Sequence, residues 1–265
     1  MIWWRWEKFV HKAMIDVSIL SSAERLLWSY GVRAPEHIDL DAIAAARGAQ
    51  VVYRRLDGCA ARLVASGERA VISVALDDYP SRQRFSLGHE LAHWICDKNR
   101  DSFKCANADI APQNDEAKTL EAYANSYASQ LLLPDYLVVP CIGSKPVNLD
   151  LARSLATDFR ASLTASAIKL ARRAKVPTVI TCHDQTRRRW YQKNMAFPQD
   201  IHVRGQLHHD THAFEMVFGG MEGMSRPKRE SADRWLNGPG VYRMSVSSQS
   251  FRLPDGTALS LITLL

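Results

Sequence analysis

The pentapeptide His-Glu-Leu-Ala-His at residues 89–93 constrains this chain more than any other part of its sequence. Residues four apart on a helix lie about 40° apart around the axis, so His89 and His93 project from one face and can bind one metal ion. Glu90 leaves the same side of the helix, where it can reach water beside that ion. The opposite face carries an apolar stripe of Leu87, Leu91, Trp94 and Ile95. This stripe argues against a chance match and predicts a helix that is buried on one side and carries a metal site on the other.

A zinc site that works on a substrate needs a third protein ligand and one open position. The extended pattern that supplies a third histidine would need Gly at 96 and His at 99, but these positions hold Cys96 and Asn99. We expect Glu121 to be the third ligand, on a helix that ends before Pro134. Small residues on its helical face, which would allow a close approach to the histidine helix, are Ala117, Ala124 and Ala128. The other interpretation is a solvated surface glutamate, the usual fate of Glu.

The two motifs together resemble the ImmA/IrrE family of bacterial metallopeptidases. Members carry a His-Glu-x-x-His helix, here within Arg84–His93, and a Glu-x-x-Ala-Asn-x-Phe-Ala helix that ends in Leu-Leu-x-Pro, here Glu121–Pro134. Tyr127 stands where Phe is usual. The resemblance is firm from about residue 20 to residue 175. It implies a zinc peptidase that cuts a helix-turn-helix repressor and so releases stress or mobile-element genes.

Composition places the chain among globular proteins that work in a reducing compartment. Five cysteines are an odd number and form no Cys-x-x-Cys pair, which favours the cytoplasm over a disulfide scaffold. No apolar run is long enough to span a bilayer. The net charge of +6 favours acidic partners, including nucleic acid. The first ten residues hold three Trp and one Phe among charges, and we expect them to pack on the protein's own surface.

The pattern predicts an α+β fold with two domains. Residues 1–176 are expected to form a zincin-like metallopeptidase domain, in which helices flank a small sheet and an edge strand can hold an extended peptide beside the metal. Its elements before the motif are helices near 22–30 and 38–47 and strands near 51–56, 61–65 and 70–75. Residues 147–174 form a pair of short amphipathic helices that resemble a helix-turn-helix. Such a pair either reads DNA or serves as a packing unit.

Residues 177–265 are expected to form a second α/β domain of the usual domain size. Strand-like stretches lie at 178–182, 188–191, 240–246 and 259–265, with a short helix at 231–236. This part looks similar to the GAF-like sensor domain that some family members carry. His208, His209 and His212 lack a nearby Cys or acidic cluster, so we expect surface histidines and no second metal site.

One stretch of the second domain interleaves basic and aromatic residues, a combination that suits single-stranded nucleic acid. A strand with a solvated basic face is an equally good interpretation. The candidate nucleic-acid-binding residues are Arg187, Arg188, Arg189, Trp190, Tyr191 and Lys193.

Cys105 lies in a polar stretch between the two ligand-bearing helices, and a thiolate is a good zinc ligand. The chain also resembles the CapP peptidases of bacterial anti-phage (CBASS) systems, which are paired with a repressor and proposed to use a cysteine switch triggered by single-stranded DNA. This resemblance implies that the Cys105 thiolate holds the fourth zinc position, at about 2.3 Å, in a resting enzyme. We expect Cys96 to be a small buried residue, and Cys59, Cys141 and Cys182 have no ligand-like context.

These residues define a mechanism in which Zn²⁺ held by His89, His93 and Glu121 activates water and Glu90 takes its proton and passes it to the leaving amine. Candidates for steadying the oxyanion are Tyr123, Tyr127 and Arg84. Two other functions fit the sequence: a nucleic-acid-binding transcriptional regulator with a structural metal site, and a zinc hydrolase of small amides. A structural site needs no general base, so the presence of Glu90 favours an enzyme.

Overall fold

The computed structural model of the chain describes residues 15–76, 79–96 and 115–265. The Trp-rich N-terminal segment and Cys105 lie outside the described residues. The chain divides into two compact units. The first reaches Pro140 and also takes in Thr157–Ser162, and the second holds Cys141–Ala156 and Leu163–Leu265.

The first unit contains the three strands that the sequence predicts. β1 (Ala49–Arg54), β2 (Ala61–Ser66) and β3 (Arg69–Ala75) form a sheet in the order β1-β3-β2. β1 runs parallel to β3, whereas β2 pairs antiparallel with β3 and forms an edge of the sheet. Alternate residues such as Leu63, Ile72 and Val74 are buried, as expected for a sheet with one face on a core.

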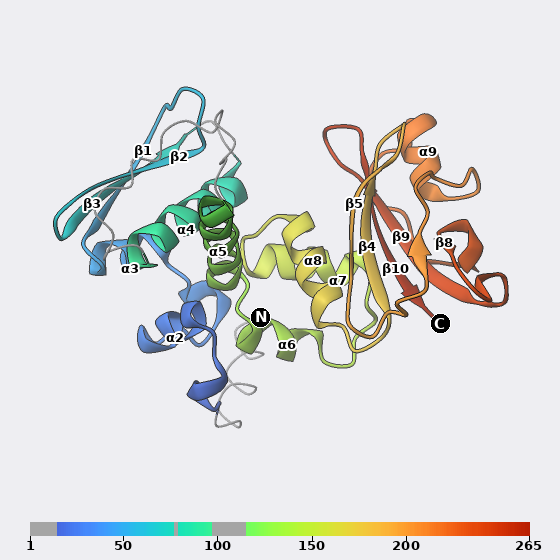
Figure 1. The fold of residues 1–265 in the computed structure, drawn as a ribbon, viewed down its shortest axis with the longest axis horizontal. Helices are drawn as coiled ribbons and strands as arrows, with labels where there is room; N and C mark the ends of the chain where they lie inside the picture. Colours follow the sequence, from blue (N-terminus) through green and yellow to red (C-terminus); the bar gives the residue numbers. More distant parts are fainter. Residues whose placement is uncertain (1–14, 77–78, 97–114) are drawn as a thin grey trace, which may run out of the picture. The chain divides into compact units, whose positions relative to one another are not determined.

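The helices of this unit follow the expected order in the chain. α2 (Ser22–Ser29) and α3 (Leu40–Ala46) precede the sheet, and α4 (Pro80–Cys96) and α5 (Asp115–Leu132) follow it. Among the described residues there are also two short 3-10 turns, Val17–Ile19 and Pro35–His37, and α6 (Asp135–Ile142), which continues past Pro140 into the second unit. Helices α3 and α4 contact the sheet, and α5 lies alongside α4 (Figure 1). The helix that carries the histidines therefore lies between the sheet and the helix that carries Glu121.

Small residues bring α4 and α5 together. A Cβ atom placed on Gly88 would lie 3.5 Å from the Ala128 Cβ atom, which is ordinary van der Waals contact, so a larger side chain would not fit without movement. Ala124 and Ala128 are both buried at this interface, while the side chain of Ala117 is not among the described ones. The expected close approach of the two helices is thus present, and Gly88 contributes to it as well.

The helix pair that resembles a helix-turn-helix comprises α7 (Leu149–Asp158) and α8 (Leu163–Arg173). α8 packs against strands of the second unit, and Arg172 donates from Nη2 to Gln192 Oε1 at 3.1 Å. The first compact unit ends at Pro140 apart from Thr157–Ser162, so α8 belongs to the second unit. The domain boundary predicted from the sequence lies after residue 176. Helix α8 buries Ala167, Leu170 and Ala171, and it packs on the sheet of the second unit.

The second unit is built on a five-stranded antiparallel sheet in the order β5-β4-β10-β9-β7. Helices α8 and α9 (His212–Phe218) lie on opposite faces of this sheet (Figure 1). All six residues of β4 are buried, as expected for a central strand that is covered on both faces. The strands are β4 (Thr178–His183), β5 (Arg188–Lys193), β7 (Lys228–Ser231), β9 (Ser245–Arg252) and β10 (Ala258–Leu264), and a separate pair is formed by β6 (His202–Val203) and β8 (Leu236–Asn237).

Two predictions about this unit were wrong. Residues 240–246 do not form one strand, because Val241–Arg243 is a 3-10 turn and β9 begins at Ser245. The expected helix at 231–236 is reduced to the 3-10 turn Ala232–Arg234. Most of β9 was not predicted because three of its four buried residues are polar: Ser248, Gln249 and Ser250 are nearly inaccessible to solvent and are hydrogen-bonded.

None of the helices in the described parts of the chain is long and apolar enough to cross a membrane.

Candidate metal centre and active-site cleft

Helix α4 is fixed by its apolar face and presents its histidines on the other. Leu87, Leu91 and Trp94 are buried, as expected, and the Trp94 indole donates to the Arg47 carbonyl at 2.8 Å. Ile95 is only half-buried. The helix cannot rotate without exposing these side chains, so its opposite face keeps a constant orientation.

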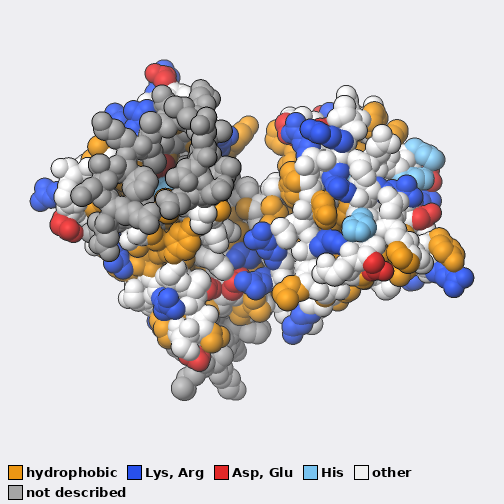
Figure 2. Space-filling view, viewed as in Figure 1, with side chains coloured by type: hydrophobic (Ala, Val, Ile, Leu, Met, Phe, Trp, Pro, Cys, Tyr) orange, Lys and Arg blue, Asp and Glu red, His pale blue; other side chains and the backbone are white. Residues whose placement is uncertain are grey.

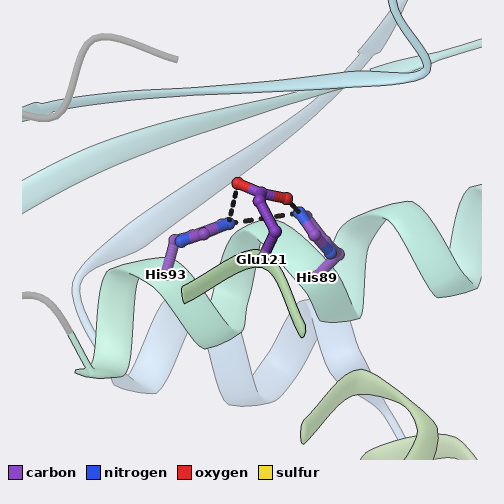
Figure 3. A group of neighbouring side chains, drawn as sticks. All are labelled: His89, His93 and Glu121. Atoms are coloured by element: carbon purple, nitrogen blue, oxygen red, sulfur yellow. Dashed lines mark hydrogen bonds and ion pairs between the residues drawn. The ribbon is translucent and has the colours of Figure 1, made fainter. Parts of the chain in front are cut away.

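His89, His93 and Glu121 converge on one point (Figure 3). The two Nε2 atoms lie 3.1 Å apart, and the Glu121 carboxylate oxygens lie 3.2 Å from His89 Nε2 and 3.4 Å from His93 Nε2. Three ligands held at zinc–ligand distances in a tetrahedral site would lie about 3.3 Å from one another. The donor set therefore fits a zinc ion in both chemistry and spacing.

Asn125 orients the first histidine. Its Oδ1 atom lies 3.1 Å from His89 Nδ1, so Nδ1 carries the hydrogen and Nε2 presents its lone pair to the shared point. Burial lowers the pKa of His89, and the neighbouring His93 lowers it further, which keeps the imidazole neutral at pH 7. Asn125 follows Glu121 by one helical turn on α5, so this helix supplies both the candidate metal ligand Glu121 and the side chain that orients His89.

Glu90 lies beside this group and is nearly inaccessible, with 6% of its surface exposed. Burial raises the pKa of Glu90 to about 7, against a smaller lowering by His93 and by a backbone hydrogen bond from Leu63. Its Oε2 atom is buried and has no hydrogen-bond partner among the described residues. A buried carboxyl group that titrates near pH 7 is suited to general base catalysis.

A cleft of about 600 Å³ opens beside these residues. One wall belongs to helices α4 and α5 and includes Arg82, Phe85, Ser86, His89, Glu90 and Asn125. The other, which we call the sheet-side wall, consists of Leu56, Gly58, Cys59, Ala60, Ala61 and Ala75. The cleft is large enough for a segment of substrate and brings it to Glu90 and His89.

The three candidates for oxyanion stabilisation lie away from the cleft lining. The Tyr123 hydroxyl lies 3.2 Å from Ser22 Oγ, and burial raises the pKa of Tyr127, which stays neutral. Arg84 donates to the Ile38 carbonyl at 3.4 Å. The geometry gives none of the three a contact with the metal-binding group.

The cysteines differ from expectation. Cys96 is exposed at the end of α4, so the prediction of a buried residue was wrong, because the apolar stripe ends one residue earlier. Cys59 had no evident context in the sequence, yet it lines the cleft together with Glu90. Cys141 and Cys182 are buried. The predicted zinc ligand Cys105 is not among the described residues, so its role stays a prediction.

Most basic residues of the predicted nucleic-acid-binding stretch have partners within the protein. Arg189 pairs with Asp184 at 3.2 Å and with Asp255 at 3.3 Å. Lys193 donates to the carbonyls of Pro198 and Ile201, and the Arg188 guanidinium lies over the Tyr191 ring. Figure 2 shows Lys and Arg side chains gathered over the part of the second unit that carries β5. The exposed residues of this stretch are Arg187, Arg189 and Tyr191, and of these Arg189 is paired with two carboxylates.

Of the three histidines predicted to lie at the surface of the second unit, His209 is exposed and His208 and His212 are partly exposed, whereas His183 on β4 is buried. The sequence indicates no Cys or acidic cluster beside the three, but His208, His209 and Asp210 lie close enough together to hold a metal ion, with Asp210 3.5 Å from His209 Nε2. The same carboxylate lies 3.3 Å from Arg234 Nη2, and its backbone carbonyl accepts from Lys228. Two neighbouring cations disfavour a metal ion at this position.

Comparison with known proteins agrees with the first site. The model of the IrrE N-terminal-like domain of peptidase family M78 matches residues 44–184, more than half of the chain. The chain belongs to this family of metallopeptidase domains. Its fold is similar to that of a Mycobacterium tuberculosis transcriptional regulator, with a TM-score of 0.60 and 16% identity over 92% of this chain and 75% of that chain. No curated protein matches the sequence.

Proposed function

We propose that the protein is a regulated zinc endopeptidase that cuts a helix-turn-helix transcriptional repressor. The observation that carries this proposal is the convergence of two imidazoles and one carboxylate within 3.1–3.4 Å. Glu90, buried beside them with a free oxygen, supplies the general base that a purely structural metal site would not need. Membership of the M78 family supports a peptidase.

His89, His93 and Glu121 would hold the ion, and Asn125 would keep His89 in the required tautomer. Bound zinc supplies Lewis-acid chemistry, polarising a scissile carbonyl and lowering the pKa of water. Glu90 takes the proton from the attacking water through its unpaired oxygen and delivers it to the leaving nitrogen.

The substrate main chain is proposed to lie along β2. This strand is an edge of its sheet, so alternate backbone groups face outward and can pair with an extended peptide. Ala61, the first residue of β2, lines the cleft that contains Glu90. A peptide added to this edge would therefore pass directly beside the general base.

Regulation is proposed to involve the C-terminal residues 177–265 as a GAF-like sensor and single-stranded DNA as its trigger, as in the CapP peptidases that the chain resembles. The antiparallel sheet with helices on both faces is compatible with such a domain. Arg187 and Tyr191 are the exposed residues best suited to meet a nucleic acid. Cys105 would occupy the open zinc position at rest, and Cys105→Ala would then cut the repressor without a trigger. The proposed location is the cytoplasm.

The test uses zinc-loaded full-length protein and the helix-turn-helix protein encoded beside its gene, with and without single-stranded DNA. We expect cleavage by the wild type, none by Glu90→Gln, and normal cleavage by the control Glu36→Gln, whose carboxylate is exposed in the same unit. Glu121→Ala should lose zinc. Cleavage by Glu90→Gln at the wild-type rate, or full zinc occupancy in Glu121→Ala, would contradict the assignment.

A second candidate is a nucleic-acid-binding transcriptional regulator with a structural metal. It is favoured by the fold shared with a protein described as a transcriptional regulator. Sequence-specific binding to a promoter fragment, unchanged in Glu90→Gln and accompanied by no proteolysis, would select this function.

A further inference from the structure

The cleft beside Glu90 has a sheet-side wall made almost entirely of small side chains. Five of its six residues are Gly, Cys or Ala, and Leu56 is the exception. Gly58 has no side chain, and the three alanines of the wall reach only as far as Cβ. The cleft is therefore wide on this side because the side chains of the wall are small.

The opposite wall supplies an aromatic surface. Phe85 lies one helical turn before His89, and the two ring centroids are 6.5 Å apart. None of the six sheet-side residues carries a charge. The charged side chains of the cleft, Arg82 and Glu90, lie on the opposite wall, so a charged substrate side chain directed at the sheet-side wall would lose hydration without gaining a partner there, whereas an apolar one would bury surface between that wall and Phe85.

We propose that the part of the cleft beside the sheet-side wall is a specificity pocket. It selects substrates that have a large apolar side chain, aromatic or branched aliphatic, next to the scissile bond. A cavity of about 150 Å³ already accepts a benzene ring, so a cleft of about 600 Å³ holds such a side chain with its flanking main chain. This inference rests on the proposed peptidase function and names the class of residue that it cuts beside.

Ala61 is the position at which the pocket can be closed. It points to the same side of β2 as the buried Leu63, toward α4, and it is half-buried at the cleft. Ala61→Leu adds three carbons to the wall. The matched control is Ala65→Leu, the same change on the same strand at an exposed position outside the cleft.

The probes are dipeptide hydroxamates that differ only in one side chain: benzyl, isobutyl or methyl. Affinity is measured by calorimetry on zinc-loaded full-length protein, so the readout does not depend on turnover. We expect benzyl and isobutyl to bind about 10- to 100-fold more tightly than methyl, the range for burying one large apolar side chain. Ala61→Leu should remove most of this preference by weakening the binding of the benzyl and isobutyl compounds, whereas Ala65→Leu should keep it.

A second measurement locates the side chain directly. Cys59 is a half-buried thiol on the sheet-side wall, and its alkylation by iodoacetamide can be followed by mass spectrometry. The benzyl compound should slow alkylation of Cys59 at least tenfold more than the methyl compound, with no difference at the exposed Cys96. If circular dichroism shows that Ala61→Leu is unfolded, the variant Cys59→Leu is used in its place to fill the same wall.

Equal affinities for the three compounds, a preference that survives Ala61→Leu, or equal protection of Cys59 would overturn the pocket. So would the failure of every compound to bind protein that metal analysis shows to be zinc-loaded. Failure to retain zinc at all would instead contradict the proposed function, so the two failures are distinguishable.

Discussion

Replacing Glu90 with Gln is expected to stabilise the metal-free protein above neutral pH, although it removes the proposed catalytic base. Burial raises the pKa of Glu90 from 4.5 to about 7, so the folded protein keeps a proton that the unfolded chain releases. Between these values stability falls as the pH rises, because the unfolded state binds fewer protons. Above pH 7 the ionised group costs about 3 kcal/mol.

The substitution to Gln keeps the shape of the side chain and cannot ionise. We expect the difference in unfolding free energy between variant and wild type to grow from about 1 kcal/mol at pH 5 to about 3 kcal/mol at pH 8. The assay is urea-dependent hydrogen exchange of the peptide that covers α4, in chelator-treated protein, because it reports on the unit that contains Glu90.

The control is Glu36→Gln, whose carboxylate is exposed and whose effect should be within about 0.5 kcal/mol at both pH values. A Glu90→Gln effect that is the same at pH 5 and pH 8, or a variant less stable than wild type at pH 8, would refute the reasoning. Either result would mean that burial does not hold this carboxyl group in its neutral form.

Three further outcomes follow from individual contacts. Asn125→Ala removes the partner of the first histidine and should weaken zinc affinity about 10- to 100-fold, measured by competition with a chromophoric chelator; unchanged affinity would exclude an orienting role. Gly88→Ala should be tolerated, whereas Gly88→Leu should push α5 away from α4, cost about 1–3 kcal/mol in thermal unfolding and release zinc. Trp235→Phe removes an indole that donates to buried Glu230 at 2.7 Å and should cost about 1–3 kcal/mol, and a neutral effect would mean that water replaces the donor.

The catalytic unit could be predicted well from the sequence because its signals are local. The spacing of His89, Glu90 and His93 fixes their face of one helix, and the alternation of buried residues marks the three strands. Glu121 could be predicted as the third ligand from the small residues on its helical face. The orienting role of Asn125 follows from the same helical spacing, one turn beyond Glu121, and could have been deduced once that ligand was assigned.

Other features depend on contacts between distant segments, and the sequence carries no local mark of them. Cys59 reaches the cleft only because the β1–β2 connection passes beside α4. In the sequence, Gly88 indicates only a flexible position, and its packing role depends on the contact with Ala128. Strand β9 reads as a polar loop, since the hydrogen bonds that allow Ser250 to be buried come from Ser260 and Ser225.

The side chain of Gln249 on β9 has a consequence for how the second unit can be divided. Its Oε1 atom accepts from the Leu149 backbone N–H at 2.7 Å, and its Nε2 atom donates to the Asp150 carboxylate at 3.0 Å and to the Ser225 carbonyl at 2.9 Å. The first turn of α7 is thus capped by a residue about 100 positions later in the chain. A protein shortened at residue 176 would keep the hydrogen bond from the Leu151 N–H to Asn148 but lose Gln249, leaving the Leu149 N–H without its acceptor. The smallest piece that keeps these contacts must therefore include the C-terminal sheet, so the stability of α7 depends on the folding of that sheet.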